Sequence, residues 1–393
     1  MSIPRGAVRT TTFIVVGLTV LACAFFVWLL TVAASSSMAH VTERVTKAVA
    51  EAQARNPRRP VIRGEAVPGS AWAEYEHGLA LAKGVVVADV RNWLDGTAAA
   101  DRNKAEAVLA ANGTALDFLR AGARKAEGAY PVRWASGTRT DVPSLMAVKN
   151  LTALAVGQAR VLLEAGKPKE AAELLLDAAQ FGADAGRNTT LIGELTALSS
   201  LAEVFDGLKT LPPDAEVGRA LAVLDATFPN HGETLLNELT VTGVTFTELG
   251  RGFAVPAGWR FGFSQGAMLA EAWTTLEDLM HRTAATTTAP WAEARRLQAE
   301  IEMEARRSSN PIVQTMIPSL LRAHQSSREG LARLRMLRVL HGRATGLADP
   351  FGGTLLSDGA KVWSLGADGI DGRGAGAWKP APTGDIVLEL PPR

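Results

Sequence analysis

The segment GFSQG over residues 262–266 matches the G-x-S-x-G pattern of a nucleophile elbow, with Ser264 at its centre. In that chemistry a serine on a strained strand-to-helix turn attacks a carbonyl, and an acid and a histidine from other segments activate it. The downstream candidates for the acid and the base are Asp278, Asp349, His324 and His341. Helical periodicity on both sides of the motif favours the alternative interpretation, a glycine-rich loop in which Ser264 caps the next helix.

Two acid–histidine pairs at i,i+3 spacing form a second constellation, Glu74 with His77 and Asp278 with His281. A helix places both members of each pair on one face, which is the spacing that di-metal carboxylate bundles use. Such a centre needs two further inward carboxylates. The candidates for these are Glu194 and Glu238. The alternative is that both histidines lie on helix surfaces beside ordinary ionic partners. No P-loop, H-E-x-x-H or Rossmann glycine pattern occurs, so the sequence implies no cofactor.

The elements that must position these residues belong to a chain of 393 residues with 41 basic and 40 acidic side chains. A formal net charge of +1 argues against nucleic-acid binding through bulk charge. A hydrophobic content of 47% excludes global disorder. Cys23 is the single cysteine, so the sequence offers no disulfide framework, no cysteine-based zinc site and no dithiol redox centre.

Residues 13–34 carry no charge, and as a helix they would cover ~33 Å against a hydrocarbon core of ~30 Å. Arg5 and Arg9 precede this segment, so the positive-inside rule predicts a signal-anchor helix in the bacterial inner membrane with the rest of the chain outside the cytoplasm. The lipid bilayer is then the first partner. Two alternatives remain open: a signal peptide cleaved near the small residues 32–34, and a lipoprotein modified at Cys23.

The predicted membrane segment, with its cytoplasmic tip, occupies residues 1–34, and residues 35–69 are expected to form a stalk helix and a linker. Val41 and Val45 have helical spacing, and the sequence NPRRP over residues 56–60 ends that helix. Residues 70–343 are expected to form an irregular, all-helical domain. Ser70 and Asp101 are suited to cap its first helices.

A helical hairpin is the clearest unit in this region, with helices expected over residues 142–164 and 168–181. Gly166, between them, can adopt the left-handed capping conformation. The pair resembles a tetratricopeptide hairpin, but no 34-residue repetition continues it, so a regular solenoid is not expected. Further helices are predicted over residues 190–208, 214–225, 233–249, 265–283 and 290–307. Asn310 and Pro311 begin the last long helix, which Pro318 should kink or divide.

Composition changes in residues 344–393, where glycine becomes frequent and β-prone pieces appear at residues 361–364 and 386–390. A small β-containing appendage is expected. Three ordered motifs in this region resemble the ending of the major pseudopilins of type II secretion. They are DPFG at residues 349–352, VWSLGADG at residues 362–369 and GDIV at residues 384–387. Pseudopilins are processed before a phenylalanine and carry a glutamate early in the apolar helix; neither feature is present between Met1 and Leu30, so polymerisation as a pilin is not expected.

The resemblance implies a calcium-binding loop, because the pseudopilin ending binds this cation through carboxylates and carbonyls. Carried over by position, the ligands are Asp368, Asp371 and Asp385, with the Leu365 carbonyl as a backbone ligand. This chain lacks the two acidic residues that pseudopilins usually place before the closing strand. The Asp-Gly pairs have an alternative interpretation, in which the carboxylates cap backbone amides in tight turns.

As a whole the chain is similar to uncharacterised bacterial envelope proteins with one anchor, a helical middle and this ending. Residues 188–192, the helix at Asn310 and the arginine–leucine run 331–340 carry that likeness. The sequence thus predicts a mainly α-helical, membrane-anchored scaffold or protein-binding domain facing outward. Its expected protein partners lie in the envelope, in secretion or pilus machinery. The competing hypothesis is an envelope serine hydrolase that uses Ser264.

Overall fold

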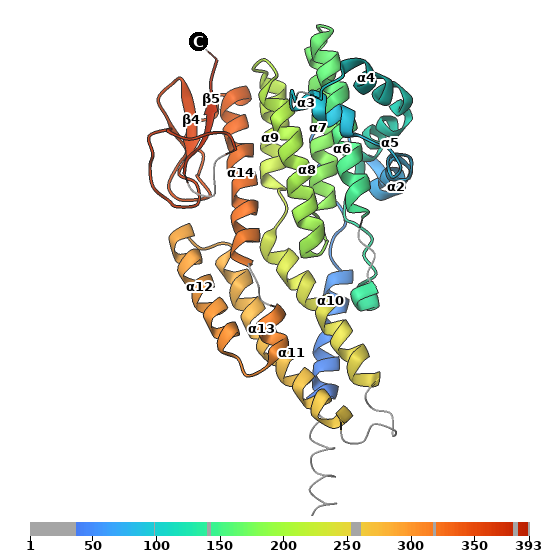
Figure 1. Ribbon diagram of the computed structural model, residues 1–393, viewed down its shortest axis with the longest axis vertical. Helices are drawn as coiled ribbons and strands as arrows, with labels where there is room; N and C mark the ends of the chain where they lie inside the picture. The colour runs from blue at the N-terminus through green and yellow to red at the C-terminus, as the bar shows by residue number, and fades with distance from the viewer. Residues whose placement is uncertain are drawn as a thin grey trace, which may run out of the picture.

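The described part of the chain is mainly α-helical, with a small antiparallel sheet near its carboxyl end (Figure 1). The predicted membrane segment, residues 13–34, lies outside that part. The computed structural model describes residues 37–97, 99–139, 143–252, 261–316, 320–379 and 384–391. Among these residues, no helix combines the length and the apolar character that crossing a bilayer requires.

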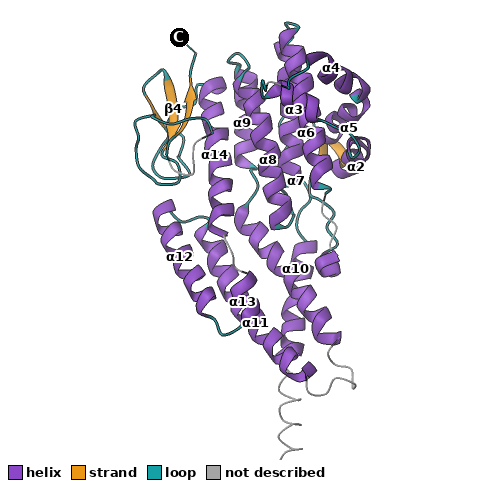
Figure 2. Cartoon of the chain, in the orientation of Figure 1, coloured by secondary structure: helices purple, strands orange, loops and turns teal. Residues whose placement is uncertain are grey.

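An upper bundle of helices shares one hydrophobic core (Figures 1 and 2). Its helices are α2 (Ala71–Ala82), α3 (Ala88–Leu94), α4 (Arg102–Ala111), α5 (Gly113–Ala123), α6 (Leu145–Glu164), α7 (Pro168–Ala185), α8 (Leu191–Lys209), α9 (Ala215–Ala226) and α14 (Leu320–Gly342). The two predicted caps are confirmed, because the side chain of Ser70 accepts from the Trp72 amide and that of Asp101 accepts from the Lys104 amide.

The predicted helical hairpin is confirmed as α6 and α7, which pack against each other. Gly166 has a φ of +72°, the left-handed conformation expected where α6 ends. Helix α7 runs four residues past the predicted end at Phe181, and Ala183 and Ala185 are buried there with it. Val142, the predicted start of the hairpin, lies outside the described residues.

The helix over residues 37–53 belongs to a second, lower bundle with its own core (Figure 1). The other helices of this bundle are α10 (His231–Gly252), α11 (Phe261–Thr286), α12 (Trp291–Arg307) and α13 (Pro311–Met316). Val41 and Val45 are only 4% and 3% exposed, and a Cβ added at Gly243 would lie 2.6 Å from Val45. Arg44 pairs with Glu277 on α11. The predicted helix is therefore present, but its apolar residues at helical spacing are buried against α10 and α11.

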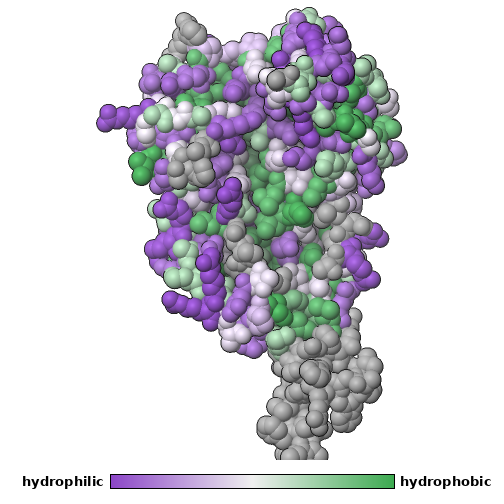
Figure 3. Space-filling model, viewed as in Figure 1, coloured by the Kyte–Doolittle hydropathy of each residue, from purple (hydrophilic) through white to green (hydrophobic). Residues whose placement is uncertain are grey.

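Two contacts connect the bundles, because α10 of the lower bundle contacts α8 of the upper one and α12 contacts α14. Figure 3 shows apolar side chains gathered across the middle of one face, over the region where Figure 1 places α8. Ile192 and Leu195 are exposed hydrophobic residues of that helix. Asn310 accepts from the Ile312 amide, which confirms the predicted cap of α13, while Pro318 lies outside the described residues.

The predicted β-containing appendage is a three-stranded antiparallel sheet in the order β3 (Leu356–Ser357), β4 (Lys361–Ser364), β5 (Ile386–Glu389). It is joined to the upper core rather than separate, because Val362, Ile386 and Leu388 share that core. Arginines of α14 donate to its carbonyls. The donor–acceptor pairs are Arg328 with Pro350, Arg333 with Trp378 and Arg335 with Ala348. The predicted arginine–leucine run therefore has two faces, one in the core and one holding this sheet.

A second, two-stranded parallel sheet was not predicted. It pairs β1 (Val67–Ser70) with β2 (Lys125–Glu127) and bridges the linker to the end of α5. Strand β1 contains Pro68 and Gly69, which indicate a turn rather than a strand in a sequence, and it shows no apolar alternation. Its partner has only three residues.

Candidate functional site

Ser264 lies three residues after the start of α11, inside a helix. Residues 253–260, immediately before this helix, lie outside those the structure describes, so no strand is observed directly before Ser264 among the described residues. Asp278 is on the same helix, ~21 Å further along the axis at ~1.5 Å per residue, and it pairs with Arg282 at 3.0 Å. A nucleophile and its acid cannot cooperate along one straight helix over that distance.

The two candidate bases are structural histidines with neutral imidazoles. His341 joins α14 to α8 and α9, because its Nε2 contacts the Leu208 carbonyl at 3.0 Å and its Nδ1 accepts from the Asp214 amide. Burial lowers its pKa. His324 accepts a hydrogen bond from Arg328 Nε at 2.8 Å, and burial, with the charge of Arg328, lowers its pKa to about 3. Asp278, His324 and His341 are therefore each paired with residues other than Ser264.

The acid–histidine pairs do not converge either. Glu74 pairs with Lys125 at 3.4 Å, while His77 is exposed and stacks on Phe118. His281 is exposed on the surface of α11. Of the two proposed inward carboxylates, Glu194 is buried and Glu238 is half-buried, and both have other contacts. Glu194 pairs with His231 at 2.8 Å, and Glu238 accepts from the Leu191 amide at 3.0 Å. No group of three or more His, Cys, Asp or Glu side chains among the described residues is arranged to hold a metal ion.

The three aspartates of the carboxyl-terminal loop brace its turns. Asp385 is 1% exposed and accepts from the amides of Gly372 and Gly374 at 3.2 and 2.8 Å. Asp371 accepts from Trp363 Nε1 at 3.1 Å, and Asp368 accepts from the Ile370 amide at 2.9 Å. These are the contacts expected of carboxylates that cap tight turns. Calcium binding by Asp368, Asp371, Asp385 and the Leu365 carbonyl stays a prediction.

Asp349 explains the spacing of two motifs in the same region. Its buried carboxylate accepts from the Phe351 amide, the Ser364 hydroxyl and the Leu365 amide at 2.7 to 2.9 Å. The DPFG turn and the end of β4 are thereby fixed to each other. Burial raises the pKa of Asp349, although all three hydrogen bonds favour the charged form.

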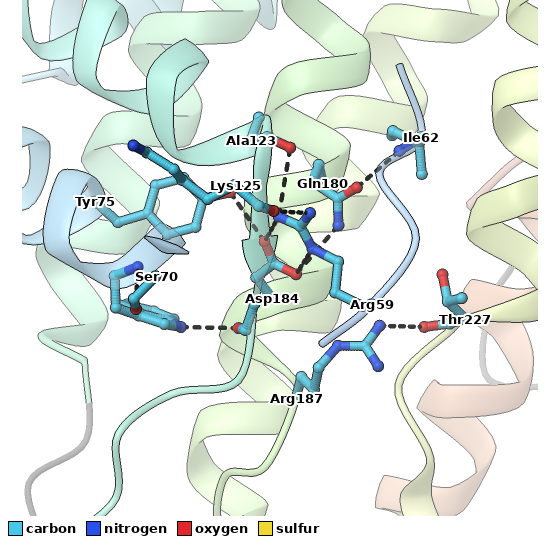
Figure 4. Close-up of polar contacts among 12 residues, drawn as sticks. Arg59, Ile62, Ser70, Tyr75, Ala123, Lys125, Gln180, Asp184, Arg187 and Thr227 are labelled. Carbon is cyan, nitrogen blue, oxygen red and sulfur yellow. Dashed lines mark hydrogen bonds and ion pairs between the residues drawn. The ribbon is translucent and has the colours of Figure 1, made fainter. Parts of the chain in front are cut away.

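A buried ionic network at the end of α7 was missed by the sequence interpretation (Figure 4). Arg59 donates twice to Asp184, at 2.9 and 2.7 Å, and both side chains are 0% exposed. Tyr75 donates to the same carboxylate at 3.0 Å and Gln180 at 3.1 Å. Burial raises the pKa of Tyr75 well above its ordinary value, so the phenol stays a donor. The network fixes the linker and α2 to α7, which makes it a structural centre.

A cleft of about 530 Å³ lies between α3, α6 and α8 and brings several charged side chains together. Its apolar lining includes Val156, Leu163 and Leu175. Its charged residues are Arg91, Asp95, Arg160, Glu164, Glu203, Asp206 and Lys379. Figure 1 shows α3, α6 and α8 adjacent at this end of the upper bundle. A mostly apolar cleft of this size with a few polar groups is typical of a ligand site.

Glu203 is a charged group of the cleft whose carboxylate has no partner among the described residues. It is half-buried, and no described residue forms a hydrogen bond or an ion pair with it. Burial raises its pKa even though the charges of Arg91 and Lys149 oppose the shift. By contrast, Arg160 pairs with Glu164 at 3.0 Å and Lys379 pairs with Asp206 at 2.6 Å. In the sequence Glu203 is one more glutamate on a helix, and only the packing of distant segments distinguishes it.

No protein-family model matches the chain, and neither the curated proteins nor the solved structures contain a match. Its function is therefore inferred from the geometry of its own residues.

Proposed function

We propose that this protein is a membrane-anchored binding protein of the bacterial envelope that holds its ligand in the cleft between α3, α6 and α8. The observation that carries the proposal is Glu203, an unpaired, half-buried carboxylate in a mostly apolar hollow. Isolated charges are expensive to bury and usually have partners. A cationic group of a ligand supplies that partner.

The ligand class follows from the lining of the cleft. An ammonium or guanidinium group forms a charge-assisted hydrogen bond with the Glu203 carboxylate, and an aliphatic or aromatic body contacts Val156, Leu163 and Leu175. A lysine side chain on an apolar segment of a partner protein meets this description. A scaffold that holds another envelope protein is therefore consistent with the same chemistry.

Binding can be measured with dansylcadaverine, a fluorescent primary amine with an apolar ring, on the full-length protein in zwitterionic lipid nanodiscs. Its uncharged N-acetyl derivative is the comparison, and empty nanodiscs supply the blank. We expect a saturable signal with a Kd at least ~10-fold lower for the amine, because a hydrogen bond to a charged group contributes about 1.5–3 kcal/mol. Glu203→Gln should abolish this preference, whereas Glu216→Gln, at an exposed glutamate of α9, should preserve it.

The pH dependence of the preference for the amine is a second measurement in the same experiment. An ordinary glutamate has a pKa of about 4.3, and that of Glu203 is raised by burial. As pH falls, Glu203 is protonated before exposed glutamates. The preference for the amine should therefore disappear at a pH above the ordinary pKa of a glutamate. Equal affinity for both probes at pH 7.5, or a preference retained in Glu203→Gln, contradicts the proposal.

Glu203→Gln should itself fold, which makes its loss of binding interpretable. Since the pKa is higher in the folded state, folding takes up a proton between the ordinary and the raised values, and stability falls as pH rises through that window. Glutamine is uncharged, so the variant does not have the free-energy cost of burying the carboxylate. We therefore expect the melting temperature of the variant to exceed that of the parent at pH 7.5, with the difference closing as pH falls.

The membrane location rests on residues 13–34, whose uncharged length and flanking Arg5 and Arg9 support a retained anchor. Alkaline carbonate extraction of cell membranes tests it, because a spanning helix resists this treatment. The intact chain should stay in the pellet, and replacing residues 20 and 27 by lysine should release it. Recovery of the unaltered chain in the supernatant rules the anchor out.

A further inference from the structure

A cavity of about 250 Å³ lies between the end of α7 and the beginning of α10, separate from the cleft of Glu203. It is lined by residues 186–188 on one side and by residues 226–230, Glu233 and Thr234 on the other. Figure 4 shows Arg187 extending away from the Arg59–Asp184 pair toward Thr227. A cationic side chain therefore borders this cavity.

Arg187 has no carboxylate partner among the described residues. One guanidinium nitrogen donates to the Thr227 carbonyl at 3.0 Å, while the buried Nε finds no acceptor in the described part of the chain. The two carboxylates whose charges act on Arg187 are engaged by other arginines, Asp184 by Arg59 and Glu233 by Arg55. Burial, together with the charge of Arg59, lowers the pKa of Arg187, while the charges of Asp184 and Glu233 act to raise it. A cation in this situation is costly unless an anion joins it.

Unpartnered polar atoms are concentrated around this place. Among the described residues, nine buried side-chain atoms find no hydrogen-bond partner, and five of them are close together in sequence or across the α8–α10 contact. They belong to Arg187, Asn188, Thr189, Glu194 and His231. Only two of the five, Arg187 Nε and Asn188 Oδ1, belong to residues that line the cavity. Because buried polar groups in native proteins are nearly always satisfied, these two indicate a polar guest. Arg187 Nε supplies a donor and Asn188 Oδ1 an acceptor beside the cavity.

The rest of the lining is compatible with an anion. Glu233 is the only carboxylate among the described residues that line the cavity, and Arg55 compensates it at 3.1 Å. Asn230 caps α10 by accepting from the Glu233 amide at 3.3 Å, so the positive end of that helix faces the same side. The volume is enough for one small oxyanion with several waters, which occupy ~30 Å³ each.

We propose that this cavity is a binding site for a phosphate or carboxylate group, with Arg187 as its principal donor. The guanidinium pairs with the oxyanion through charge-assisted hydrogen bonds. Asn188 Oδ1 accepts from a hydroxyl of the ligand, as monohydrogen or dihydrogen phosphate presents. The site does not depend on the cleft, and Glu203→Gln should leave it unchanged.

Thermal unfolding of the full-length protein in zwitterionic nanodiscs tests the site, with sodium phosphate or sodium acetate titrated against sodium chloride at constant ionic strength. We expect a saturable rise in melting temperature, about 2–4 °C at tenfold above Kd. A response to phosphate alone identifies a phosphate site, and a response to acetate identifies a carboxylate site; both support the proposal. The absence of a saturable rise with either anion overturns it.

Arg187→Met removes the donor and should abolish the rise. Because the unpaired charge disappears with it, this variant is expected to fold at least as well as the parent. Arg187→Lys keeps the charge without Nε and should weaken binding at least ~10-fold. Arg219→Met, at an exposed arginine of α9, is the matched control and should keep the full response. An equal rise in Arg187→Met means that phosphate or acetate acts elsewhere, and the assignment fails.

Discussion

Replacing Asp184 by asparagine is expected to lower the free energy of unfolding by about 3–5 kcal/mol. The amide keeps the shape of the side chain but leaves the Arg59 guanidinium, which is fully buried, without a counter-charge. Tyr75 and Gln180 lose a charged acceptor at the same time. Urea unfolding of the protein in mild detergent, followed by circular dichroism, measures the change.

Asp117→Asn is the matched control, because Asp117 pairs with Arg120 at 3.2 Å on an exposed helix surface. Exposed pairs contribute ~0–1 kcal/mol, so this change should be small. The double variant Arg59→Met with Asp184→Leu removes both charges and should cost less than Asp184→Leu alone. If Asp184→Asn proved as mild as Asp117→Asn, water would have to reach the network, contrary to its burial.

Local features of the fold were predictable because their causes are local. A capping side chain needs only the next three amides, which is why Ser70 and Asp101 mark the starts of α2 and α4. Gly166 turns left-handed for lack of a Cβ. Strand β4 coincides with the predicted residues 361–364. In each case a few neighbouring residues determine the conformation.

Burial of charge could not be predicted in the same way. Arg58 and Arg59 are neighbours in a linker, and the sequence gives no reason to treat them differently, yet Arg58 is exposed and Arg59 is fully buried. The difference comes from Asp184, which is far away in sequence. The helix over residues 37–53 was likewise expected to be a stalk, because its apolar stripe does not reveal whether lipid, solvent or α10 and α11 cover it.

The candidate sites also divide into features that a short stretch of sequence reveals and features that only the packing of distant segments reveals. Short patterns such as GFSQG around Ser264 are easily noticed, but their chemistry needs a sheet and partners that the described helices do not provide. Glu203 and Arg187 have no motif around them. What distinguishes them is a missing partner in a hollow formed by helices from distant parts of the chain, and a missing partner is visible only in three dimensions.

A single methyl group at Gly218 is expected to destabilise the fold by about 1–3 kcal/mol or more. Helices α9 and α14 cross at this residue, and a Cβ there would lie 2.4 Å from Gly342 Cα and 2.6 Å from its nitrogen. These are backbone atoms, so no rotamer change relieves the contact. Asp225, near the other end of α9, pairs with Arg335 and Arg338 and keeps the helices from separating freely.

Comparing the melting temperature of Gly218→Ala with that of Gly113→Ala isolates this contact. Nothing lies within 4 Å of a Cβ at Gly113, and alanine there should be neutral or stabilising by about 0.4–1 kcal/mol. Gly218→Ala should also destabilise the carboxyl-terminal sheet, because hydrogen bonds from Arg333 and Arg335 attach this appendage to α14. Faster amide exchange in β4 and β5 would show this. Equal melting temperatures of Gly218→Ala and Gly113→Ala would mean that α9 and α14 move apart at little cost in free energy. In that case α14 could not be a rigid support for the sheet.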